Sequence, residues 1–294
     1  MITLQINGVP VRLNWTTFPD TARGASISGA LPTNPVDATI FARPDFKKGV
    51  NEMLFDIGMV VNILRNINNR IYIKLLMPYI PYARQDRNMV GHDAFTLKVF
   101  AAMLNSYNLD SVVVVDPHSD VSTGLINNVK IITQADVIGT NPIAEVLGRK
   151  NYALISPDAG ALKKVHKVAE VLNIFTIGMM SKHRNTETGT LSGFRLDSPV
   201  SELIGKDLLI VDDICDGGGT FLGAADELRR VLGNSINVDL WITHGLFTQG
   251  TERLFNGGIN KVYTTDSVYY GDGAHNLDVF SCFGIAAARN YVRD

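Results

Sequence analysis

Residues 208–220 have the sequence Leu-Leu-Ile-Val-Asp-Asp-Ile-Cys-Asp-Gly-Gly-Gly-Thr. The first four residues are apolar and predict a buried strand that ends at two adjacent carboxylates, Asp212 and Asp213. A glycine-rich turn follows, and the apolar spacing after it predicts a helix over residues 221–231. Such a turn presents backbone N–H groups and the positive end of a helix dipole at one point, which is an anion site. Carboxylates beside an anion site predict a ligand with both hydroxyls and phosphate, such as a sugar phosphate.

The rest of the chain alternates between predicted strands and helices. An opening hairpin is predicted over residues 2–6 and 11–15, further strands over 71–77, 111–115, 153–156, 174–180, 236–243 and 261–265, and helices over 51–65, 94–104, 160–172 and 285–292. Strands that alternate with helices predict parallel sheets with ligands at the carboxyl ends of the strands. We therefore expect an α/β protein with domains at residues 1–138 and 139–284, and residues 285–294 as a possible addition to the first domain.

Composition excludes several classes of protein. The 294 residues are enough for two domains with a well-buried core. A net charge of −2 gives no reason to expect nucleic acid or an anionic membrane as a partner. The cysteines, Cys215 and Cys282, cannot build a disulfide framework. The start of the chain has no signal-peptide pattern and no run of 18 apolar residues occurs, so we expect a cytoplasmic protein.

Five other segments place polar or charged residues near the ends of predicted strands. They are residues 78–87 (Pro-Tyr-Ile-Pro-Tyr-Ala-Arg-Gln-Asp-Arg), 115–119 (Val-Asp-Pro-His-Ser), 155–160 (Ile-Ser-Pro-Asp-Ala-Gly), 182–184 (Lys-His-Arg) and 243–245 (Thr-His-Gly). In order and spacing these segments, with the loop of residues 212–220, resemble the ribose-phosphate diphosphokinase family, also called phosphoribosyl pyrophosphate synthetases. The Tyr-Ala-Arg-Gln-Asp-Arg part is highly specific to that family. The resemblance implies two phosphoribosyltransferase-type α/β domains, each with a mainly parallel central sheet flanked by helices.

The resemblance implies a role for each residue of the opening stretch. Asp212 and Asp213 would hold the ribose 2- and 3-hydroxyls. The 5-phosphate would lie in a cradle made by Asp216, Gly217, Gly218, Gly219 and Thr220. Glycine suits a cradle because it lets the backbone approach a phosphate closely, and the threonine adds a hydroxyl donor.

A second set of residues would bind ATP. The guanidinium groups of residues 84–87 suit bidentate contacts with a polyphosphate, and by resemblance this segment grips the ATP triphosphate through Arg84, Gln85, Asp86 and Arg87. Phe18 and Asp20 would contact the base. The family's Phe-Ser-Asp-Gly-Glu pattern is here Phe-Pro-Asp-Thr-Ala, so its last carboxylate is absent and base recognition is expected to be altered.

The remaining site residues concern metal and catalysis. By resemblance, His118 and Asp158 bind the Mg²⁺ that bridges the ATP phosphates, a sparse but workable pair because magnesium keeps most of its water. Lys182 and Arg184 would lie on a loop that closes over the reacting phosphate and neutralises its charge. The implied reaction is attack of the C1 hydroxyl of ribose 5-phosphate on the β-phosphorus of MgATP, which releases AMP.

One departure from the family leaves the acceptor open. Where the family loop usually has threonine after Asp216, this chain has Gly217, which removes a donor and some bulk beside the 5-phosphate. The change permits a larger 5-substituent, so ADP-ribose, giving ADP-ribose pyrophosphate for NAD synthesis, is the alternative acceptor. A non-catalytic regulatory homologue is a second alternative, and a simple phosphoribosyltransferase would lack the ATP-binding segment. The family also implies a homo-oligomer, a dimer-based hexamer with an ATP site shared between subunits.

Overall fold

The computed structural model describes residues 1–46, 49–88, 90–184, 191–271 and 275–292. Contacts along the chain divide it into two compact units. The first unit comprises Met1–Thr133 together with Cys282–Asp294, and the second comprises Gln134–Ser281. No described helix is long and apolar enough to cross a membrane.

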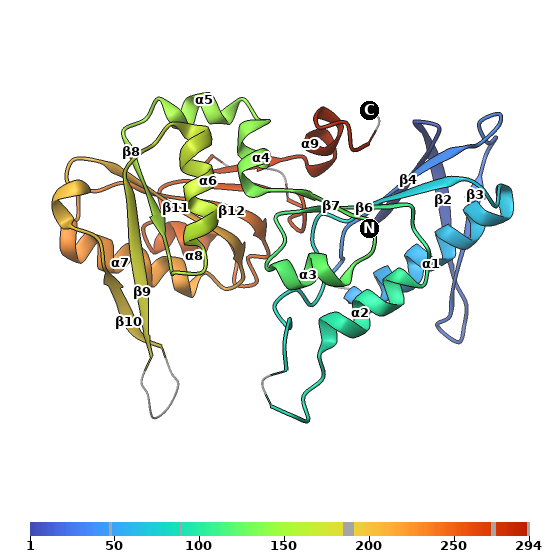
Figure 1. The fold of residues 1–294 in the computed structure, drawn as a ribbon, viewed down its shortest axis with the longest axis horizontal. Coiled ribbons are helices and arrows are strands. Elements are labelled where there is room, and N and C mark those ends of the chain that lie inside the picture. Colours follow the sequence, from blue (N-terminus) through green and yellow to red (C-terminus); the bar gives the residue numbers. More distant parts are fainter. Residues whose placement is uncertain (47–48, 89, 185–190, 272–274, 293–294) are drawn as a thin grey trace. The chain divides into compact units, whose positions relative to one another are not determined.

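The first unit is a seven-stranded sheet with the order β3-β2-β1-β4-β5-β6-β7. Its elements are β1 (Ile2–Ile6), β2 (Val9–Thr17), β3 (Arg23–Ser28), β4 (Asp37–Ala42), α1 (Val50–Ile67), β5 (Tyr72–Leu76), α2 (Thr96–Asn105), β6 (Ser111–Val115), α3 (Asp120–Leu125), β7 (Val129–Ile132) and α9 (Cys282–Ala288). Strands β4 to β7 are parallel, and β1 to β3 extend the sheet by antiparallel pairing. Helices α1 and α2 cover one face of this sheet and α9 covers the other (Figure 1). Phe283 of α9 packs against Phe41 of β4 with ring centroids 5.9 Å apart.

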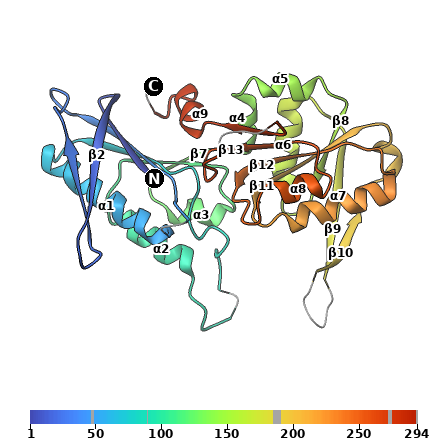
Figure 2. The ribbon, with the colours of Figure 1, turned by 180° about the vertical axis from the view of Figure 1, so that it is seen from behind.

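The second unit is a seven-stranded sheet with the order β10-β9-β8-β11-β12-β13-β14. Its elements are α4 (Gln134–Gly139), α5 (Ile143–Gly148), β8 (Tyr152–Ser156), α6 (Leu162–Leu172), β9 (Ile177–Arg184), β10 (Leu191–Leu196), the short 3₁₀ helix Val200–Glu202, β11 (Asp207–Cys215), α7 (Gly219–Leu232), β12 (Val238–Gly245), α8 (Glu252–Asn256), β13 (Val262–Thr265) and β14 (Leu277–Phe280). All neighbouring strands are parallel except β9 and β10. Within this unit, α4, α5 and α6 lie on one side of the sheet, and α7 and α8 on the other (Figures 1 and 2).

Two predicted element boundaries are wrong in ways that matter for the site. The strand predicted over residues 208–211 continues to Cys215, because its pairing with β12 extends to the Cys215–Gly245 register pair. The two carboxylates after Val211 therefore lie within β11, with side chains on opposite faces of the sheet. The strand predicted over residues 174–180 instead runs to Arg184 and pairs with β10, so Lys182 lies on a strand and not in a loop.

The division between the units also differs from the predicted one. The boundary expected between residues 138 and 139 falls inside α4, and the contacts assign the whole of α4 to the second unit. Gln134, the first residue of α4, is fully inside that unit and is hydrogen-bonded to β11 and β12. The domain limits expected from the sequence, residues 1–138 and 139–284, stay a prediction.

Candidate active site

The loop between β11 and α7 has the geometry of an anion site. Helix α7 begins at Gly219, and its N-cap Gly218 has φ 80°, which an L side chain rarely adopts. A Cβ atom on Gly218 would also lie only 2.7 Å from Cδ2 of Leu254, so this position needs glycine for two reasons. The first N–H groups of a helix have no partner within it. The 14-residue helix α7, which carries Thr220 in its first turn, therefore presents donors to the predicted cradle.

The segment that follows β12 holds this loop in place. The hydroxyl of Thr248 donates to Oδ1 of Asp216 over 2.6 Å, and the Thr248 N–H donates to the Asp216 carbonyl over 3.1 Å. Arg253 of α8 donates from Nη1 to the Gly217 carbonyl over 3.0 Å. These contacts hold the Asp216 end of the loop against the segment after β12, and the predicted part of Asp216 in phosphate binding stays a prediction.

The adjacent carboxylates of β11 have different surroundings. Asp213 is buried, with 6% of its surface exposed, and its Oδ2 accepts a hydrogen bond from Nζ of Lys164 over 3.0 Å. Asp212 is only partly buried and its Oδ1 accepts the N–H of Asp213 over 2.9 Å. Burial and the charge of Asp213 raise the pKa of Asp212 well above the usual carboxyl range. Asp212 is therefore the carboxylate of the pair that has no cation in direct contact among the described residues.

Asp158 and Lys182, predicted as a metal ligand and a catalytic cation, contact each other directly. Nζ of Lys182 lies 2.7 Å from Oδ2 of Asp158, while Oδ1 of Asp158 accepts the N–H groups of Gly160 and Ala161 over 3.0 and 3.2 Å. Burial alone would raise the pKa of Asp158, but the hydrogen bonds and the charge of Lys182 outweigh it and lower the pKa. The charges of both residues also act on Asp212, so the three lie in one electrostatic neighbourhood.

In the first unit, the segment predicted to grip ATP follows β5. The side chains of Arg84, Gln85 and Arg87 are exposed, whereas that of Asp86 is largely buried and contacts Nε of Arg87 over 3.3 Å. His118 is exposed after β6, the parallel neighbour of β5. Because parallel neighbours end at the same sheet edge, the ATP segment and His118 both follow carboxyl ends there.

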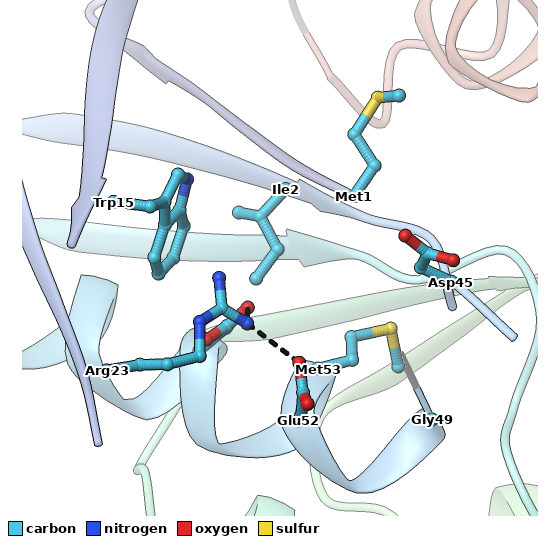
Figure 3. Close-up of a pocket in the computed structure, with 9 residues that line it drawn as sticks. Met1, Ile2, Trp15, Arg23, Asp45, Gly49, Glu52 and Met53 are labelled. Carbon is cyan, nitrogen blue, oxygen red and sulfur yellow. Dashed lines mark hydrogen bonds and ion pairs between the residues drawn. The ribbon is translucent and has the colours of Figure 1, made fainter. Parts of the chain in front are cut away.

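Phe18 and Asp20 lie in the turn between β2 and β3. Phe18 is 51% exposed, and Asp20 closes the turn by accepting the N–H of Ala22 over 3.0 Å. Beside this turn, the start of β3 is fastened to α1 by Arg23, which contacts Glu52 over 3.0 Å (Figure 3). Arg23 also contacts Asp56 of α1 over 2.8 Å.

The guanidinium of Arg23 also lies 5.0 Å from the ring centroid of Trp15. These groups line a pocket of about 260 Å³ whose other walls include Ile2 and Met53. The pocket shows how the hairpin is anchored, since one cation joins the aromatic side chain of β2 to two carboxylates of α1.

Two predicted relations are not established by these positions. His118 belongs to the first unit and Asp158 to the second, so their joint binding of a metal stays a prediction. Within the described residues no three histidine, cysteine, aspartate or glutamate side chains gather as a metal site. The side chain of Arg184 lies outside the described residues, although its backbone ends β9.

Sequence reasoning missed the residues that support the site from a distance. Gln134 is 98% buried, and its Nε2 donates to the Asp212 carbonyl over 2.7 Å and to Oγ1 of Thr243 over 3.1 Å. Lys164, which pairs with Asp213, was missed as well. Neither residue belongs to a local sequence motif. The one signal for Lys164 was the apolar spacing of residues 160–172, which predicted a helix directly after Asp158.

Comparison with known proteins identifies the relatives of this arrangement. A family model described as phosphoribosyl transferase domain matches residues 130–239. A ribose-phosphate pyrophosphokinase of Corynebacterium efficiens is 30% identical over 232 residues, which is 78% of this chain and 70% of that protein. Ribose-phosphate pyrophosphokinase 2 of Archaeoglobus fulgidus is 29% identical over 262 residues, 84% of this chain and 87% of that protein.

A solved structure has the same fold over nearly the whole length. The phosphoribosylpyrophosphate synthetase of Mycobacterium smegmatis superposes with a TM-score of 0.78 at 23% identity, over 96% of this chain and 91% of that one. The predicted fold class, two α/β units with mainly parallel sheets flanked by helices, is confirmed. The chain belongs to the ribose-phosphate pyrophosphokinase family, and it is an enzyme of the diphosphotransferase type.

Proposed function

We propose that this enzyme transfers the β,γ-diphosphoryl group of ATP to the C1 hydroxyl of ribose 5-phosphate, giving phosphoribosyl pyrophosphate and AMP, with Mg²⁺ as cofactor. The observation that carries the proposal is the grouping of Asp212, the glycine loop and the Asp158–Lys182 pair in one unit. A carboxylate for sugar hydroxyls thus lies near an anion cradle and near a cation for the reacting phosphate. Membership of the pyrophosphokinase family supports this class of reaction.

The acceptor would bind through β11 and the loop that follows it. Asp212 would accept hydrogen bonds from the ribose hydroxyls, since its carboxylate is partly exposed and carries no lysine of its own. Asp213 would hold its place through the ion pair with Lys164 and fix the strand end. The loop N–H groups would receive the 5-phosphate at the start of α7. The ribose hydroxyls would then be held by β11 and the 5-phosphate by the start of α7, so one strand–loop–helix element would orient the sugar.

The donor would bind through the first unit. The exposed guanidinium groups of Arg84 and Arg87 suit the ATP triphosphate, and the exposed ring of Phe18 suits a nucleobase face. Contacts from Phe18 and Asp20 to a neighbouring subunit would make a homo-oligomer, a dimer-based hexamer, the active form. Light scattering with an activity measurement across protein concentrations tests that form.

The donor set fits a magnesium ion. Asp158 already holds a cation, the Lys182 ammonium, on an oxygen whose sister oxygen is fixed by two amides. Oδ2 would become a hard oxygen ligand of Mg²⁺ once Lys182 turns to the transferred group, and His118 would be the second protein ligand. Bound there, the ion would supply charge neutralisation to the ATP phosphates. Lys182 and Arg184 would neutralise the charge that develops on the transferred group. The rest of the rate acceleration would come mainly from holding the attacking hydroxyl in line with the leaving oxygen.

Release of AMP from MgATP in the presence of ribose 5-phosphate tests the proposal, with the product identified by ³¹P NMR. AMP that depends on both the sugar and Mg²⁺ supports it. The matched variant Asp212→Asn keeps the side-chain shape and should raise the acceptor KM by about tenfold or more, since an amide has one acceptor oxygen where a carboxylate has two. Absence of AMP with every sugar tested would favour a regulatory homologue without activity.

One observation favours ADP-ribose as a second candidate acceptor. A broad surface hollow of about 490 Å³ runs from Gly219 along α7, and its lining comprises Gly193, Phe194, Gly223, Asp226, Glu227 and Arg230. Space beside the cradle would accept a substituent larger than a terminal phosphate. Parallel reactions with ribose 5-phosphate and ADP-ribose distinguish the two, and AMP formed only with ADP-ribose would reverse the order of preference.

A further inference from the structure

The space beside Gly217 is filled by another residue. Gly217 has no positive φ, so its backbone would accept any side chain. A Cβ atom built there would lie 3.2 Å from Nε2, 3.3 Å from Cδ and 3.6 Å from Cγ of Gln249. The carboxamide of Gln249 therefore lies in tight contact with the position of a Cβ atom at 217, and a side chain there would have to displace it.

The backbone around Gln249 is fixed to the loop. Its neighbour Thr248 makes two hydrogen bonds to Asp216, one from the hydroxyl and one from the N–H. On the other side, Gly250 has φ 78° and donates its N–H to the Phe247 carbonyl over 2.8 Å, which closes a tight turn. The position of Gln249 against the loop thus follows from the backbone of both segments.

The side chains of residues 248–253 differ in how many hydrogen-bond donors remain available to a ligand. The Thr248 hydroxyl is directed to Asp216, and Nη1 of Arg253 is directed to the Gly217 carbonyl. The side chain of Gln249 is exposed, and its carboxamide has no hydrogen-bond partner among the described residues. A carboxamide N–H is a good donor to an anionic oxygen. Among the described residues the Gln249 carboxamide is therefore uncommitted, whereas Arg253 already gives one of its N–H groups to the loop.

We propose that Gln249 determines acceptor specificity by donating its carboxamide N–H to the phosphate of the acceptor, from the place that a side chain at position 217 would otherwise occupy. The inference rests on the proposed function. It makes positions 217 and 249 alternatives for one role, since the two side chains compete for one volume. A donor at position 249 reaches the phosphate from the α8 side, beside the cation of Arg253.

The test is a double-mutant cycle of Gln249→Ala, Gly217→Thr and the double variant. Loss of a hydrogen bond to a charged group should raise the acceptor KM of Gln249→Ala by about tenfold, with kcat and the ATP KM changed less than about twofold. Gly217→Thr should also raise the acceptor KM, because its side chain meets Gln249. The double variant should return to within about threefold of wild type, since threonine then has both space and a hydroxyl donor.

Calorimetric titration with ribose 5-phosphate and with ADP-ribose, without ATP, gives the same comparison independently of turnover. Lys163→Ala, on the exposed face of α6, is the control variant and should leave KM and melting temperature unchanged. Unaltered acceptor affinity in Gln249→Ala, or additive losses in the double variant, would overturn the inference even if wild type is active. Failure of wild type to bind either sugar overturns it as well, whereas sugar binding without AMP formation contradicts only the proposed reaction.

Discussion

Replacing Lys182 by alanine separates its contribution to turnover from its contribution to stability. The ion pair with Asp158 is short, 2.7 Å, but the two side chains are 24% and 35% exposed. Solvent screens a pair of that exposure, and such pairs contribute about 0.2–1 kcal/mol to stability. The melting temperature of Lys182→Ala should therefore fall by no more than about 4 °C for a protein of this size.

The effect on turnover should be far larger. Transfer of a diphosphoryl group builds negative charge on oxygens, and removal of one preorganised charged donor costs about 10²–10³ in kcat. The ATP KM should change less than about threefold, because a group that acts only on the developing charge contributes little to ground-state binding. Release of AMP at saturating substrates gives kcat, and a calorimetric ATP titration gives the affinity.

Two controls make the result decisive. Lys163→Ala removes an exposed lysine of α6 and should match wild type in every measurement. A turnover of Lys182→Ala within about threefold of wild type would refute the catalytic role, since one donor should cost about 10² or more. A fall in melting temperature beyond about 10 °C would instead refute the view that solvent screens the pair.

Three further outcomes follow from contacts described above. Arg23→Met leaves the buried carboxylate of Asp56 without its cation and should lower the free energy of unfolding by about 2 kcal/mol in urea titration, whereas Arg12→Met, at an exposed site on β2, should not. Gln134→Leu removes a buried donor and should cost about 1–3 kcal/mol of stability and weaken acceptor binding in calorimetry; unchanged binding would contradict its support of β11. The pKa of Asp212 is raised by burial and by its acidic neighbour, so the folded, ligand-free protein binds more protons than the unfolded chain above about pH 4. Its stability should fall as the pH rises towards that raised pKa, and Asp212→Asn should abolish this slope and add about 1–2 kcal/mol at pH 8.

The sequence predicts those elements best whose pattern is local. Residues 111–115 were predicted as a buried strand, and β6 has these bounds with every residue buried. A run of four valines predicts such a strand because it is short, β-branched and apolar on both faces, which suits a central strand of a parallel sheet. The end of β11 was predicted wrongly because pairing with β12, and not local sequence, extends it past Asp212.

The candidate site divides in the same way. Asp158 and the glycine loop could be singled out from the sequence because each follows a predicted strand, and their roles stay predictions. Lys164 and Gln134 could not, since they meet Asp213 and Asp212 from 49 and 78 residues away. Those contacts exist only once the strands are assembled, and a single sequence carries no periodicity that marks them.

The bonds between the glycine loop and the segment after β12 have a consequence for how this enzyme can diverge. Thr248 and Arg253 reach Asp216 and Gly217 across 32 and 36 residues of chain. A substitution in one segment changes the volume and the donors available to the other, so its effect depends on the residue already present there. The two segments therefore form one energetically coupled unit, and a change of acceptor preference should require substitutions in both.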